Sequence, residues 1–411
     1  MSNTPDFISV GLPVTNPNVS GVIQDQVTAT RLALAANETD ALIALKRAWL
    51  ISQNRIMQKL LALQTRILQN EGTPSRSWIT QLEQYKALSA QITTELQQIA
   101  IVLKDAQLQS GIKNIQSGIQ DVTSQMTVSL NEAFGGVANV TGIVESSGAG
   151  TVIVNSIQIP LNAPAPKALR VLVSRLSMTN SPLYKSLLDE FGNDAKQMID
   201  RLITGLVAGE NPRVIAGDIQ RMLQTPLYRA ERIARTEILT AYRESNRATM
   251  QANSHIIKKW VWYANLTTCC ASCLGMHGTT HDVSEPMGTH PNCRCVPVPS
   301  VEIIPELDDM NFGGDKIAEK ARTDAIKTLH NTPREQLRNR FGNAKGSLMY
   351  EGQVKLSELV STYKSNLYGV FRREATVAEL LQRTGIDITQ FSGEKISLED
   401  KILKAIRKAK Q

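Results

Sequence analysis

All five cysteines of this chain fall between Trp260 and Pro299, and this cluster constrains the fold more than any other feature. A Cys-x2-Cys pair is followed about twenty residues later by a His-x2-Cys-x-Cys sequence. Two tight knuckles joined by a short hairpin can each aim two ligands at one point, as a tetrahedral metal requires. The pattern therefore predicts a structural zinc site whose ligands come from five residues: Cys270, Cys273, His290, Cys293 and Cys295.

The choice of four ligands among these five stays open. The spacing gives two equal knuckles if His290 and Cys293 complete the set, and Cys295 is then spare or replaces one of them. Cys269 is left out because it points away from Cys270 in an extended chain. A metal would stabilise a small sheet, because its binding free energy becomes folding free energy. Disulfides formed in an assembled particle, and buried free thiols, remain alternatives.

The composition supports a metal site over disulfides. The chain has 411 residues, 42% hydrophobic and 20% charged, which is typical of a globular protein with two or three domains. The first residues show no secretory signal, and no apolar run is long enough for a membrane span. We therefore expect a reducing compartment, where clustered cysteines are more often metal ligands than disulfides.

Two long helical patterns precede the cysteines. Residues 22–70 are almost free of Gly and Pro, with apolar residues at spacings of three and four, and a second such pattern runs to about residue 134. A short Gly- and Pro-containing connection separates them, which predicts an antiparallel helical hairpin. We interpret this hairpin as a spacer or assembly arm that packs against copies of itself or against another subunit.

The fold class predicted for the whole chain is mainly α with small β elements. Proline and glycine positions divide it into five segments. These are an extended arm (1–20), the helical hairpin (21–135), a β-hairpin with a Pro-rich linker (136–166), a helical domain that carries the cysteines (167–300), and a helical C-terminal region with a basic tail (301–411).

The net charge of +7 resides in the second half of the chain, where one helix has alanines on one side and arginines on the other. A charged helix face is most often simply solvated, and contact with nucleic-acid phosphates is the alternative. The candidate DNA contacts are Arg229, Arg243, Arg247, Lys404, Arg407 and Lys408.

Five motifs together resemble the head morphogenesis domain of tailed bacteriophages, the family of the minor head protein of phage Mu. They are R-I-A-R-T-E at residues 232–237, a W-x-W strand, the Cys-x2-Cys pair, an H-G turn, and H-P-N-C-R-C at residues 290–295. The resemblance covers about residues 167–300. Some relatives lack the first Cys-x2-Cys pair, so the family does not guarantee the metal.

The resemblance implies a virion structural protein with no enzymatic activity. It implies a place at the portal vertex inside the capsid, reached from the host cytoplasm, and a role in head assembly and in DNA packaging or ejection. The expected partners are the portal protein, the major capsid protein or a scaffold, packaged DNA bound without sequence preference, and further copies of the chain, with no membrane.

Two further hypotheses concern single residues. Arg232, Arg235 and Glu237 are expected to form a buried clamp that joins their helix to the sheet. The rival function is a zinc-dependent nuclease of the His-Asn-His type that uses His277 and His290. The chain lacks the acid-histidine pair of such an enzyme, and it has no nucleotide-binding P-loop.

Overall fold

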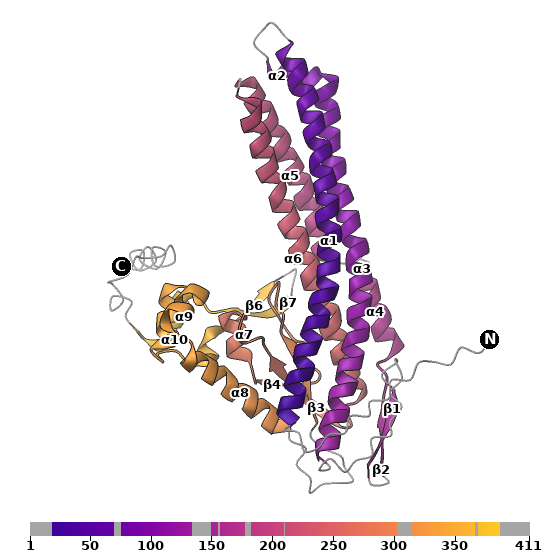
Figure 1. The fold of residues 1–411 in the computed structure, drawn as a ribbon, viewed down its shortest axis with the longest axis vertical. Helices are drawn as coiled ribbons and strands as arrows, with labels where there is room; N and C mark the ends of the chain where they lie inside the picture. The colour runs from indigo at the N-terminus through magenta and orange to yellow at the C-terminus, as the bar shows by residue number, and fades with distance from the viewer. Residues whose placement is uncertain are drawn as a thin grey trace, which may run out of the picture. The chain divides into compact units, whose positions relative to one another are not determined.

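A computed structural model describes most of the chain, and it is mainly helical with three small antiparallel sheets (Figure 1). This confirms the predicted fold class. None of the helices in the described residues has the length and apolar character of a membrane span. The described residues are 19–69, 75–133, 149–154, 157–176, 182–208, 210–301, 314–365 and 369–386. The predicted arm lies outside them except for its last two residues, and the basic tail with Lys404, Arg407 and Lys408 lies outside them entirely.

The chain forms two compact units, each assembled from separate stretches of sequence. Residues 32–117 and 166–242 form one, which we call the helical unit. Residues 1–31, 118–165 and 243–411 form the other, which we call the cysteine unit. Compactness does not show where an independently folding domain begins, so the five predicted segments stay predictions.

Six helices contribute to the helical unit, and three of them continue into the cysteine unit. They are α1 (Val19–Leu68), α2 (Arg76–Gln81), α3 (Glu83–Ala133), α4 (Pro166–Leu176), α5 (Pro182–Val207) and α6 (Pro212–Ala252).

The helices α1 and α3 run antiparallel, as the sequence predicts (Figure 1). Asn37 Nδ2 donates to Asn114 Oδ1 at 2.7 Å, and Ser52 Oγ donates to Glu95 Oε2 at 2.6 Å, so the residue numbers rise on one helix as they fall on the other. Apolar residues line the seam on both sides of the Ser52–Glu95 pair and include Leu45, Trp49, Ile56, Leu60, Leu88, Leu96 and Ile99. Gly111 lies within the continuous helix α3, and its missing side chain makes room for Leu176 of α4.

A three-stranded antiparallel sheet forms the centre of the cysteine unit. Its order is β4 (Thr280–Asp282), β3 (Ile257–Tyr263), β5 (Val296–Val301), and the one-and-a-half-turn helix α7 (Ala271–Met276) lies between β3 and β4 in sequence. Trp260 pairs with Pro299 across β3 and β5, so the W-x-W motif lies on a strand, as predicted. The strands β1 (Gly150–Val154) and β2 (Ile157–Leu161) form a hairpin within the predicted segment 136–166. The sequence predicts its turn at the Gly- and Ser-rich residues 146–150, whereas both strands lie from Gly150 onward, so the predicted turn is misplaced. The strand predicted before that turn lies outside the described residues.

The C-terminal region adds a second layer of short elements to this unit. They are α8 (Gly314–Asn331), α9 (Arg334–Phe341), α10 (Asn343–Tyr350), the 3₁₀ helix η2 (Leu356–Leu359), β6 (Val360–Ser365), β7 (Gly369–Glu374) and α11 (Val377–Thr384). Their apolar residues share one buried cluster with Ala271 and Leu274 of α7. The helix that carries the first cysteine knuckle is therefore part of the core of the C-terminal region.

Candidate metal centre

The first knuckle is the start of helix α7. Cys270 is the N-cap residue of this helix, and its Sγ accepts a hydrogen bond from the backbone N–H of Cys273 at 3.4 Å. A helix N-terminus presents unpaired N–H groups, which favour a thiolate at this position. The turn brings the sulfur atoms of Cys270 and Cys273 to the same side of the chain.

The second knuckle lies in the loop that leads into β5. Cys293 N–H donates to the carbonyl of His290 at 3.2 Å, which closes a turn around Pro291 and Asn292. Asn292 has a φ of 62°, a left-handed conformation that asparagine tolerates better than most residues. This turn aims His290 and Cys293 at the first knuckle.

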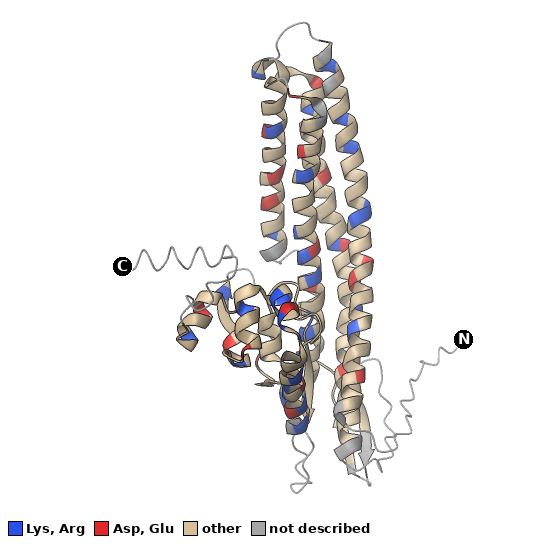
Figure 2. Cartoon of the chain, turned by 60° about the vertical axis from the view of Figure 1, so that its left-hand side comes forward, with Lys and Arg blue, Asp and Glu red and all other residues tan. Residues whose placement is uncertain are grey.

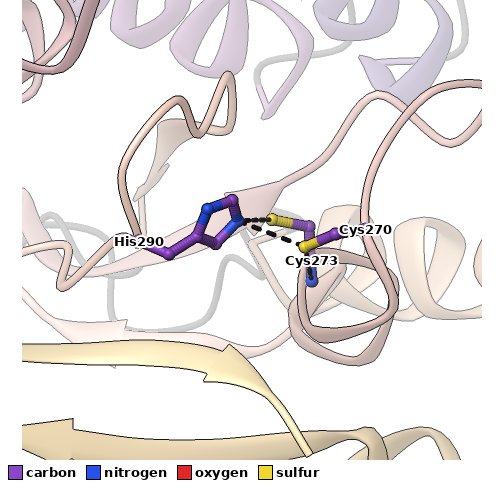
Figure 3. Close-up of side chains that lie close together, drawn as sticks. All are labelled: Cys270, Cys273 and His290. Carbon is purple, nitrogen blue, oxygen red and sulfur yellow. Dashed lines mark hydrogen bonds between the residues drawn. The ribbon is translucent and has the colours of Figure 1, made fainter. Parts of the chain in front are cut away.

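All five predicted ligands come together (Figure 3 shows three of them). His290 Nε2 lies 3.1 Å from Cys270 Sγ and 3.2 Å from Cys273 Sγ, and the sulfur atoms of Cys273 and Cys293 are 3.6 Å apart. Two tetrahedral zinc ligands with Zn–S bonds of about 2.3 Å would be about 3.8 Å apart. The cluster therefore has the donor atoms and the dimensions to hold a metal ion.

Within this cluster, the donor atoms form two overlapping groups. Cys270, Cys273 and His290 form one, and Cys273, Cys293 and Cys295 form the other, with all ligand atoms in a group within 4.8 Å of one another. Cys273 belongs to both groups. The geometry thus leaves open which of the other four gives way when only four ligands bind.

The imidazole of His290 is oriented for binding through Nε2. Its Nδ1 lies 2.8 Å from the carbonyl oxygen of Pro291, to which an Nδ1–H can donate. Such a bond to the outer nitrogen fixes the tautomer in which Nε2 carries the free electron pair. Figure 3 shows the Nε2 edge of the ring facing the two thiols.

The ionisation of these groups is strongly coupled. The hydrogen bond from Cys273, together with that from His290, lowers the pKa of Cys270 to about 5 despite burial. Burial alone would lower the pKa of His290, but its hydrogen bonds with Cys270 and Cys293 raise that pKa to about 11. Desolvation raises the pKa of Cys269 to about 12, so this thiol stays protonated. At neutral pH the cluster therefore contains a Cys270 thiolate beside a protonated His290, whereas Cys269 remains a neutral thiol.

Arg243 of α6 binds the backbone of the second knuckle. Arg243 is 4% exposed, and its guanidinium donates to the carbonyl oxygens of Cys293 and Cys295 and to Oγ1 of Thr289. The prediction of Arg243 as a DNA contact is therefore wrong, because its donors are used inside the protein. Its position on a helix near other arginines gave no signal of this role.

The C-terminal region holds the first knuckle. The backbone N–H of Ala271 donates to Glu374 Oε1 at 2.8 Å, and Lys345 Nζ lies 2.7 Å from the other oxygen of Glu374. Arg340 of α9 donates to the carbonyl oxygens of Leu266 and Cys269, just before the knuckle. These contacts fix the backbone on both sides of Cys270.

Strand β7 also reaches the second knuckle. Arg372 N–H donates to the carbonyl of Gly288 at 2.8 Å, and Thr289, which precedes His290, forms a parallel bridge with Arg372. A side chain at Gly288 would come within 2.6 Å of the carbonyl oxygen of Val370. One strand of the C-terminal region thus contacts the loops of both knuckles.

The predicted clamp joins α6 to other helices and not to the sheet. Arg235 pairs with Glu38 of α1, and the buried Glu237 pairs with Arg175 of α4 at 2.9 Å. Arg232 is exposed, and its carbonyl accepts from the hydroxyl of Thr236. The expected partners are therefore wrong: a helix pattern shows which side is buried but not which element covers it.

The other candidate DNA contacts on α6 are engaged in ion pairs. Arg229 contacts Glu190 at 3.0 Å and Asp194 at 2.6 Å on α5, and Arg247 contacts Glu244 at 2.6 Å. Figure 2 shows acidic and basic residues interspersed along the helices. A solvated, internally neutralised face explains these residues, and a DNA contact by Arg229 or Arg247 stays a prediction.

The two remaining histidines of the window are held elsewhere. Burial, reinforced by the charge of Arg31, lowers the pKa of His277 to about 4, and its Nδ1 accepts from the backbone N–H of Ala264. His281 stacks on Trp260 at 4.4 Å between ring centroids. Neither belongs to the metal-holding groups found among the described residues.

Residues 196–298 match the family of phage Mu protein F like proteins. The match begins in α5 and ends in β5, so it contains α6 and both knuckles, and it covers a quarter of the chain. It confirms the resemblance to the phage head morphogenesis family that the motifs indicate. No curated protein and no solved structure matches the chain.

Proposed function

We propose that this chain is a minor head protein of a tailed phage, a virion component without catalytic activity. The observation that carries the proposal is the match of residues 196–298 to phage Mu protein F like proteins. The site supports a structural role, because Arg243, Glu374 and Arg340 bind the backbone within or next to the two knuckles. The cluster therefore connects α7 to the loop before β5, and its donor atoms contact one another.

Within the particle, we place the protein inside the capsid at the portal vertex, where it acts in head assembly and in DNA packaging or ejection. Its partners there are the portal protein and the major capsid protein or a scaffold. The protein binds packaged DNA without sequence preference, through lysine and arginine side chains that include those of the basic C-terminal tail. Such binding weakens steeply with added salt, because phosphate contacts release counterions.

A conditional mutant of the phage that encodes this chain tests the role. A stop codon placed at position 49 in the reading frame, propagated in a suppressor host, removes the protein in a non-suppressor host. We expect particles that are empty or non-infectious, with major capsid protein still made. A normal yield of infectious virions from the non-suppressor host would overturn the proposal.

The metal in the cluster is proposed to be a single structural zinc ion. Three sulfur donors with one imidazole, or four sulfur donors, form a ligand set that zinc favours. Zinc binding requires deprotonated thiols and a neutral imidazole, so it displaces the proton that His290 otherwise holds. The ion then links α7, which belongs to the core of the C-terminal region, to the loop before β5.

Metal analysis of the purified chain tests this assignment. We expect about one zinc per chain, most of it lost in Cys273→Ser, because Cys273 belongs to both donor groups. Cys269→Ser is the matched control and keeps its zinc. Thiol titration after chelation distinguishes the alternatives, since a disulfide would leave fewer than the five thiols of the sequence. Less than half an equivalent of zinc would contradict the proposal.

A further inference from the structure

Helix α1 carries a second apolar stripe on the side opposite its buried seam. Four large residues of this stripe are exposed in the helical unit: Leu32 (69%), Ile43 (43%), Leu50 (58%) and Leu61 (57%). They are spaced by 11, 7 and 11 residues. Each of these steps returns to within about 20° of the same direction on a helix with 3.6 residues per turn. The four side chains therefore form one straight line along about 44 Å of helix.

The order of residues along this line is symmetric about the point between Lys46 and Arg47. Leu32 mirrors Leu61, and Ile43 mirrors Leu50. The residues between these four follow the same symmetry. The apolar Ala36 mirrors the half-buried, apolar Met57, and the uncharged polar Thr39 mirrors the uncharged polar Asn54. We call these eight residues, with Lys46 and Arg47 at the centre, the α1 stripe.

We infer that the α1 stripe is the interface of a two-fold dimer in which α1 of one copy packs antiparallel against α1 of a second copy. A two-fold interface must be complementary to itself. In this register Leu32 lies opposite the partner's Leu61, Ile43 opposite the partner's Leu50, and Ala36 opposite the partner's Met57. Every large apolar residue meets another apolar residue, and the polar pair Thr39 and Asn54 also meet.

The period of the stripe suits straight helices. The 29 residue steps from Leu32 to Leu61 span eight turns at about 3.6 residues per turn, which is the period of an unstrained α-helix. A heptad seam would instead need a left-handed supercoil. Helix α1 can thus keep its packing against α3 while its opposite side meets a second copy.

The charges at the centre give the dimer a distinctive response to salt. Lys46 and Arg47 lie next to the two-fold axis, so Lys46 faces the partner's Arg47. Glu231, 3.8 Å from Lys46 Nζ, neutralises part of this charge. Since like charges repel less when screened, added salt strengthens this dimer. The inference concerns α1 alone, so it stands or falls separately from the zinc centre and from the portal role.

Sedimentation equilibrium of the full chain tests the interface. Ile43→Gln combined with Leu50→Gln replaces exposed residues and should weaken dimerisation at least tenfold. Ile51→Gln is the matched control, because Ile51 is equally exposed (52%) on the same helix but points about 100° away from the stripe. It should change the dissociation constant less than twofold. A monomer at about 100 µM, or equal effects of both variants, would overturn the inference.

A photo-cross-link fixes the register. Benzoylphenylalanine at position 36 should insert into Met57 of the partner subunit, as mapped by mass spectrometry of the linked dimer. Positions 36 and 57 of one helix are about 32 Å apart, so this link cannot form within one copy. Links from position 36 to residues around 36 of the partner would mean parallel pairing and would contradict the two-fold register.

Discussion

Glu374 accepts a hydrogen bond from the backbone N–H of Ala271, with 2.8 Å between Ala271 N and Glu374 Oε1. The two residues are 103 positions apart, and the bond joins the last residue of β7 to the turn between two cysteine ligands. The carboxylate also pairs with the buried Lys345. The folded part of the C-terminal region, for which the sequence indicates no role, in this way supports the Cys/His cluster.

Removing this support should weaken metal binding. Glu374→Ala leaves the Ala271 N–H without its acceptor, and losing such a support typically costs 10- to 100-fold in metal affinity. Glu374→Gln keeps an acceptor oxygen and should lose much less. Competition with a chromophoric zinc chelator measures both, and Glu351→Ala, which breaks a surface ion pair with Arg334, is the control. Equal affinity in all three variants would remove β7 from the support of the centre.

Arg243 should contribute to stability and not to DNA binding. Arg243→Ala leaves the carbonyl oxygens of Cys293 and Cys295 without a donor in a buried place, which should cost about 3 kcal/mol or more in the free energy of unfolding. Arg243→Lys should recover part of this cost. Arg247→Ala removes only an ion pair with Glu244 on the same helix and should cost less than about 1 kcal/mol. Urea unfolding measures the three values, and a small effect at Arg243 would show that its contacts are dispensable.

His277 should make the fold sensitive to mild acid. Its folded-state pKa of about 4 lies below the unfolded value of about 6.5, so only the unfolded chain takes up a proton between these pH values. The contribution of His277 to the free energy of unfolding is therefore fully present above about pH 6.5 and is lost as the pH falls toward 4. At pH 5 the loss is about 2 kcal/mol.

The comparison with His277→Gln isolates this contribution. Its amide oxygen can accept from Ala264 N–H, and it does not titrate. The stability gap between the parent and this variant should therefore shrink between pH 7.5 and pH 5. His255→Gln, at a partly exposed histidine that contacts the carbonyl of Pro160, is the control for replacing a histidine by glutamine. Any acid release of metal affects all three proteins alike. A constant gap for His277→Gln would mean that this histidine protonates freely in the folded state.

The ligands of the centre could be predicted because each knuckle is local in sequence. Cys270 and Cys273 share one turn of helix, and His290 and Cys293 share another turn, so their spacing alone brings each pair together. The braces could not be predicted in this way. Arg243, Arg340 and Glu374 contact the knuckles across 50, 71 and 103 positions of sequence.

The long helices follow the same rule. Their apolar period predicts the hairpin of α1 and α3, because the pattern depends only on residues three and four apart. The partners of Arg235 and Glu237 come from α1 and α4 and depend on how distant elements pack. The α1 stripe is also visible in the sequence, but its significance depends on knowing which side of α1 is already covered.

Two glycines should respond in opposite directions to the same change. Gly288 lies where β7 approaches the second knuckle, and a Cβ there would be 2.6 Å from the carbonyl oxygen of Val370. Because backbone atoms must move to relieve this clash, Gly288→Ala should destabilise the protein by about 1–3 kcal/mol and also weaken zinc binding. Gly217 lies inside α6 with nothing within 4 Å of its added Cβ, so Gly217→Ala should stabilise it by up to about 1 kcal/mol. Thermal unfolding of the two variants gives the signs. A neutral Gly288→Ala would mean that β7 does not press against the loop before His290.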